Sequence, residues 1–242
     1  MAKITNIEEL LSKVDRKIGQ IDTDKLKPSP DAKEEAARDA LDEYSGSCPH
    51  LKVSEEVGDG STRRFVLSTL LGTGWIADTS LVQSVAFVRD ANTDTEQVEE
   101  LAIEDWAVRL DTSEQEVLFL DRAAGTDETI RIRWTSPHTI NELDEATVTT
   151  VPSRDTEALA LLAASKVAEW IARTACDMAN RAMGIDQVDF NTFDRRWSDK
   201  AKRLRAGAIE RLNPTELSAG GAGTSVEWKS DDRLSGLSRV SH

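Results

Sequence analysis

The spacing of apolar residues changes twice along the chain, and this change constrains the fold more than any other feature. Near the N-terminus, apolar residues recur every three or four positions, as on one face of an α-helix. From about residue 52 to 150 they alternate with polar residues, which is typical of β-strands. After Pro152 the helical spacing returns. The sequence therefore predicts an α+β fold in which a β-rich segment interrupts a set of helices.

Two helices are expected before the β-rich segment. The first follows Thr5 and Glu8, which have the spacing of a capping box. Its apolar stripe consists of Ile7, Leu10, Leu11, Val14 and Ile18. A linker over 19–29 precedes the second helix, which begins at Pro30 and ends near 45. Its buried face is expected to carry Ala37, Ala40, Leu41 and Tyr44.

Five or six short strands are expected in the β-rich segment, in an antiparallel sheet that is curled or folded into a small sandwich. The clearest strand covers 129–134, where Ile130, Ile132 and Trp134 alternate with polar residues. Further strands are expected near 65–71, 81–88, 106–110 and 117–120.

Two more helices are expected after the β-rich segment. Ser153 is the expected N-cap of a long alanine-rich helix that ends near Met183. Its many small side chains allow neighbouring helices to approach closely on more than one side. The last helix is expected over 193–212. The final segment, 214–242, has too few apolar residues to fold alone and is expected to order as an arm against a partner.

These elements divide the chain into four parts. The N-terminal helices occupy 1–50 and an inserted antiparallel β-domain occupies 51–151. The C-terminal helices occupy 152–213, and an extended arm occupies 214–242. We expect the four helices to form one bundle that the β-domain interrupts.

Charge and cysteine content exclude several classes of protein. A formal net charge of −14 argues against a free-standing nucleic-acid-binding protein and against binding to an anionic membrane. Cys48 and Cys176 are the only cysteines, so a disulfide framework or a structural zinc site is not expected. Because the sequence shows neither a secretory signal nor an apolar run of membrane-spanning length, we expect an intracellular protein.

No residue pattern indicates catalysis, a cofactor or a metal. His50, His138 and His242 match no metal-binding spacing and are expected in exposed loops, although a His–Ser or His–Cys dyad stays open. Gly72-Thr73-Gly74 lacks the lysine of a phosphate-binding loop and is expected to form a β-turn. One acidic cluster fits a solvated edge better than a cation site; it comprises Glu96, Glu99, Glu100, Glu104 and Asp105.

Basic and aromatic residues are the candidates for contacts between subunits. The last helix is rich in cations, namely Arg195, Arg196, Lys200, Lys202, Arg203, Arg205 and Arg211. Three interpretations stay open for these cations. They form a solvated face that pairs with Asp199 and Glu210, they contact an acidic partner subunit, or they contact passing DNA. Four tryptophans are expected as core or interface anchors, namely Trp106, Trp134, Trp170 and Trp197. The candidate interface residues are Trp75, Ala168, Ala172, Arg195, Arg196, Trp197, Lys200, Arg203, Trp228, Leu234 and Leu237.

Four local features follow one another along the chain. Ala40-Leu41-Asp42-Glu43-Tyr44-Ser45 precedes Pro49, and Ile130-Arg131-Ile132-Arg133-Trp134-Thr135 precedes His138. Pro152 then precedes the alanine-rich helix over 157–182. The last helix begins Phe193-Asp194-Arg195-Arg196-Trp197-Ser198-Asp199-Lys200-Ala201-Lys202. In this order, over about residues 30–212, the chain resembles the head–tail adaptor (connector) proteins of long-tailed phages and related tailed viruses.

This resemblance implies a structural protein of the virion and not an enzyme. It implies a homo-oligomeric ring, usually of twelve copies, docked on the portal protein at the head vertex. The other face of the ring would receive a neck or stopper protein or a tail-completion protein, and the genomic DNA would pass through the lumen. The ring would assemble in the host cytoplasm and end at the neck of the particle, with no cofactor and no membrane partner.

Three other hypotheses stay open. Another virion protein, such as a neck stopper, a tail-completion protein or a minor head protein, would bind the tail tube but not the portal. A ligand-binding module would use the β-domain for recognition and would be a monomer or dimer. An enzyme would use the acidic cluster with a metal, and would lose turnover when Glu99, Glu100 or Glu104 is neutralised.

Overall fold

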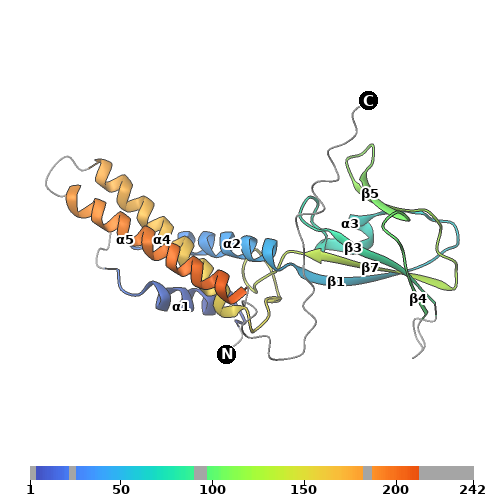
Figure 1. The fold of residues 1–242 in the computed structure, drawn as a ribbon, viewed down its shortest axis with the longest axis horizontal. Coiled ribbons are helices and arrows are strands. Elements are labelled where there is room, and N and C mark those ends of the chain that lie inside the picture. Colours follow the sequence, from blue (N-terminus) through green and yellow to red (C-terminus); the bar gives the residue numbers. More distant parts are fainter. Residues whose placement is uncertain (1–3, 22–25, 90–96, 182–186, 213–242) are drawn as a thin grey trace.

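The computed structural model describes residues 4–21, 26–89, 97–181 and 187–212. Within these residues the chain forms five α-helices and two antiparallel sheets, which confirms the predicted α+β class. The four long helices are α1 (Ile7–Ile18), α2 (Pro30–Ser47), α4 (Thr156–Arg181) and α5 (Gln187–Leu212). Figure 1 shows an elongated molecule with these helices at one end and the strands at the other. None of the described helices has the length and apolarity needed to cross a membrane.

The N-terminal ends of the first two helices are fixed by local side chains. Asn6, and not Thr5, is the N-cap of α1, because its side chain accepts a hydrogen bond from the Glu9 amide at 3.1 Å. The Glu9 carboxylate accepts in turn from the Thr5 amide at 2.8 Å. The predicted capping box is therefore displaced by one residue. In α2, Ser29 accepts from the Ala32 amide and Pro30 occupies the first turn, as predicted.

A single cluster of buried side chains joins the four long helices. Helix α4 packs against α1, α2 and α5, and its alanines let these neighbours approach closely. Ser153 is not its N-cap: the residue lies in a turn closed by a hydrogen bond from the Asp155 amide to the Pro152 carbonyl, at 3.0 Å. The helix therefore begins only at Thr156.

The strands form two sheets in the β-rich segment. The larger sheet has the order β1 (His50–Val57), β7 (Glu128–Ser136), β3 (Val82–Arg89) and β4 (Gln97–Glu100). The smaller sheet has the order β2 (Arg64–Val66), β6 (Glu116–Leu120) and β5 (Trp106–Leu110). Ile130, Ile132 and Trp134 of β7 are buried in the core of this segment, which confirms the alternation predicted for 129–134.

The strand predicted at 65–71 is correct only as far as Val66. Residues Leu67–Leu71 form the short helix α3, and Gly72–Gly74 forms one turn of 3₁₀ helix. Leu67 and Leu71 are both buried. Two residues four positions apart lie on one face of a helix and also on one face of a strand, so their spacing fits both structures. Gly72 then takes a φ of +69°, which ends the helix at low cost for a residue without a side chain.

Candidate functional site

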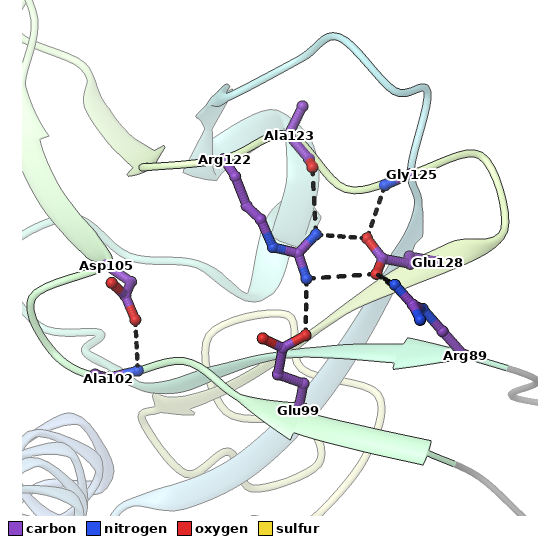
Figure 2. Close-up of polar contacts among 8 residues, drawn as sticks. All are labelled: Arg89, Glu99, Ala102, Asp105, Arg122, Ala123, Gly125 and Glu128. Carbon is purple, nitrogen blue, oxygen red and sulfur yellow. Dashed lines mark hydrogen bonds and ion pairs between the residues drawn. The ribbon is translucent and has the colours of Figure 1, made fainter.

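A buried carboxylate, that of Glu128, lies at the start of β7 with its side chain only 3 % exposed. It accepts hydrogen bonds from Nη1 of Arg122 at 2.7 Å, from the Gly125 amide at 2.8 Å and from Nη2 of Arg89 at 2.8 Å, as Figure 2 shows. These donors, Arg122 first, lower the pKa of Glu128 to about 2. The group therefore stays ionised despite its burial.

Arg122 connects this carboxylate to the neighbouring strands. Its guanidinium also donates to the exposed Glu99 of β4 at 2.8 Å and lies 3.9 Å from the ring centroid of Phe87 on β3. A hollow of about 150 Å³ lies beside these groups, bounded by Phe87, Arg89, Gln97, Val98, Glu99 and Glu128. Pockets for small molecules usually enclose roughly 300–1,000 Å³. The arrangement fits a structural link between strands better than a substrate site.

Three described members of the predicted acidic cluster have local partners. Glu99 pairs with Arg122, and Glu100 lies 3.6 Å from Arg133 of β7. Asp105 accepts from the Ala102 amide at 3.1 Å (Figure 2). Glu96 lies outside the described residues. Across the described ranges, no group of three His, Cys, Asp or Glu side chains is placed to hold a metal ion.

A second polar cluster lies where the helices meet the larger sheet. The backbone amide of His138 donates to Oγ of Ser45 at 2.9 Å, and its ring Nδ1 lies 3.0 Å from Oγ1 of Thr150. The ring centroids of His50 and His138 are 5.2 Å apart. Because His138 is buried, the prediction of an exposed loop is wrong for this residue: the chain leaving β7 folds back onto the end of α2.

The same junction holds Tyr44 and Cys48. The Tyr44 hydroxyl donates to Oδ2 of Asp155 at 2.8 Å and thereby ties α2 to the start of α4. Burial raises the pKa of the Cys48 thiol, and Asp155 adds to this effect. Burial also lowers the pKa of His138, with His50 contributing. A nucleophilic cysteine needs the opposite change, a lowered thiol pKa, so these groups fit a structural junction rather than a His–Cys dyad.

Four of the predicted interface residues are buried within the single chain. Trp75 is 8 % exposed, and its indole N–H donates to Glu116 at 2.8 Å inside the β-rich core. Ala168, Ala172 and Trp197 belong to the buried cluster of the helices. The structure therefore removes these four from the set of exposed interface candidates. Their apolar character reflects packing inside one chain, which the sequence pattern does not distinguish from packing between chains.

The basic candidates lie on α5. Arg195, Arg196 and Arg203 are exposed, whereas Lys200 is half-buried and donates to the Ile18 carbonyl. Its ammonium group lies 4.7 Å from the ring centroid of Trp197. The remaining candidates are Trp228, Leu234 and Leu237. They lie outside the described residues, as does the whole predicted arm, 214–242.

An apolar face on β1 was missed by sequence reasoning. Leu51, Val53 and Val57 are 59 %, 59 % and 70 % exposed, and they alternate with residues that point the other way. The sequence contains the corresponding pattern, because these three residues are separated by even numbers of positions, as residues on one side of a strand are. Within the described residues β1 pairs only with β7, so its other edge is open. An open edge strand with exposed aliphatic side chains is suited to contact with another chain.

No protein-family model matches the chain, and no curated protein matches it significantly. What the chain does is therefore inferred from its own residues and their arrangement. Two features bear on this inference: the exposed cations of α5 and the exposed aliphatic side chains of β1.

Proposed function

We propose that this chain is a structural virion protein, a head–tail adaptor that forms a ring under the portal. The observation that carries the proposal is the insertion of all the described strands between α2 and α4, two helices of one packed set. On this proposal the four long helices form the bundle, and residues 51–151 form the inserted β-domain. This is the order of elements that the resemblance to connector proteins implies.

The exposed face of β1 supports a role in assembly. Leu51, Val53 and Val57 lie on one side of β1, an edge strand of the larger sheet that follows directly after α2 (Figure 1). Scattered apolar side chains are common on protein surfaces, but these three share one side of a strand and form an apolar strip that Glu55 interrupts. We assign this strip to contact with the portal or with the neck protein on the other side of the ring.

The acid surplus is compatible with a channel for DNA. If twelve copies assemble, the ring carries a formal charge of about −170 from twelve times −14. A lumen of this sign repels the phosphate backbone and does not retain the passing genome. The proposal assigns no catalytic residue, cofactor or metal ion to the chain.

Electron microscopy of the purified chain, alone and mixed with the portal protein of the same virus, tests the proposal. We expect rings bound to one end of the portal, with the copy number given by native mass spectrometry. Binding to tail-tube protein without portal binding would instead indicate another virion protein. A chain that remains monomeric in the presence of portal would contradict the proposal.

The proposed arm gives a second test. Truncation after residue 213 is expected to leave the unfolding of the remaining chain unchanged and to weaken assembly, because 214–242 would dock on a neighbouring copy or on the portal. The full-length chain is the control, and both forms are compared by thermal unfolding and by sedimentation. Unchanged assembly of the truncated chain would remove the arm from the proposal.

A further inference from the structure

Helix α5 has an exposed face on which cations outnumber carboxylates. Arg195, Arg196, Lys202 and Arg203 are all exposed. Among the described residues, none of the four has a carboxylate within 4.0 Å, whereas Arg205 on the same helix pairs with Glu43 at 2.8 Å. The four cations lie within the nine residues 195–203, or about 12 Å of helix. Asp199 and Glu210 share this face, so it retains a net positive charge.

Helix α2 has an acidic exposed stripe of matching length. Its members are Asp31, Glu35, Asp39 and Asp42, all of them exposed. Their spacing of three and four residues places them on one side of the helix, over about 16 Å. No Lys or Arg of the described residues lies within ion-pair distance of these carboxylates.

The other carboxylates of α2 have cationic partners in the same chain. Glu43 pairs with Lys166 of α4 and with Arg205 of α5, each at 2.8 Å, and Glu34 lies 3.7 Å from Arg38. Helix α2 therefore separates its acids into a set that pairs internally and a set that faces solvent. The two exposed faces, acidic on α2 and basic on α5, are complementary in charge and similar in length.

We propose that the basic face of α5 in one copy docks on the acidic stripe of α2 in the next copy. This inference rests on the proposed ring, because it specifies how neighbouring copies meet. The contact joins two different surfaces, so it is head-to-tail and repeats until the ring closes. A second copy fits this face better than DNA does, because the copy presents four exposed carboxylates along one side of a helix. DNA would instead meet a chain of net charge −14.

Charge-exchange variants test the contact. One variant carries Arg195→Glu and Arg203→Glu on α5, a second carries Glu35→Lys and Asp39→Lys on α2, and a third combines all four substitutions. We expect each two-site variant to weaken self-association at least about tenfold, since two attractive charge contacts become repulsive. We expect the combined variant to recover association, because the substituted residues again carry opposite charges on the two faces. Sedimentation velocity at about 0.1 M and about 1 M salt measures both effects.

A control variant separates the contact from net charge. Glu104→Lys with Asp121→Lys makes the same charge change as the α2 variant, at exposed sites of the β-rich part, and we expect normal association. Rings that form equally well from the two-site variants, or a combined variant that does not recover, would overturn the α2–α5 contact and leave the ring intact. A wild-type chain that fails to self-associate, alone and on the portal, would overturn both the contact and the proposed function.

Discussion

The substitution Glu128→Gln tests whether the buried ion cluster of the β-rich part stabilises the fold. In the wild-type chain this carboxylate receives hydrogen bonds from Arg122, Gly125 and Arg89. Glutamine preserves the shape of the side chain but replaces one acceptor oxygen with an NH₂ group. That group would face the N–H donors around the buried carboxylate, so one of them would lose its acceptor.

The expected size of the effect follows from the pKa of Glu128. A value of about 2, against an ordinary value of 4.5, corresponds to about 3 kcal/mol in favour of the ionised form in the folded state. The Glu128 side chain is only 3 % exposed, but the Arg122 and Arg89 side chains are 42 % and 54 % exposed, so solvent screening reduces this contribution. We therefore expect Glu128→Gln to lower the free energy of unfolding by about 1–3 kcal/mol near neutral pH.

The effect should depend on pH in a defined direction. The pKa of Glu128 is lower in the folded chain than in the unfolded chain, so ionisation favours folding. This contribution is complete above a pH of about 4.5 and is lost as the pH falls through about 2. The difference between wild type and variant should therefore be largest near neutral pH and shrink as acid is added.

Urea unfolding followed by tryptophan fluorescence at about pH 7 and about pH 3 measures this difference. Glu99→Gln is the matched control, because Glu99 contacts the same Arg122 at 2.8 Å but is 63 % exposed. We expect the control to change the free energy of unfolding by less than about 0.5 kcal/mol. A loss below about 1 kcal/mol for Glu128→Gln, or an equal loss at both pH values, would refute the reasoning.

Three further predictions concern the helices and their junction with the larger sheet. Ala168→Leu should lower the free energy of unfolding by about 1–3 kcal/mol, because Ala168 is fully buried. Ala206→Leu, on the exposed side of α5, is the control and should leave stability unchanged. Equal melting temperatures of the two variants would contradict this prediction. Tyr44→Phe should cost about 1–2 kcal/mol in urea unfolding, since it removes the hydroxyl bond to Asp155; an unchanged midpoint would show that this bond contributes nothing. Burial lowers the pKa of His138, so its ring protons should titrate below about pH 6.5 by NMR. The free energy of unfolding should decline as the pH falls below that value. A titration at the ordinary histidine pKa would contradict the lowered pKa.

Local patterns predicted most helices and several strands because regular spacing is readable over a few residues. The strand predicted at 129–134 lies within β7, and the helix predicted from Pro30 is α2. Where one spacing fits two structures, as at 67–71, the sequence did not discriminate between strand and helix. The candidate interface stays a prediction: Trp75 and Ala168 are buried in the chain, and the exposed aliphatic side chains of β1 were not among the candidates.

By itself, the sequence determined the order of helical and β-rich segments, the acid surplus and the concentration of cations in the last helix. These properties depend on residue type and on spacing along the chain. Only the tertiary structure decided which of these residues face water. It brought Arg89, Arg122 and Glu128 together around one buried charge and placed His138 against α2. Burial and pairing of charges depend on contacts between distant segments, and no local pattern encodes such contacts.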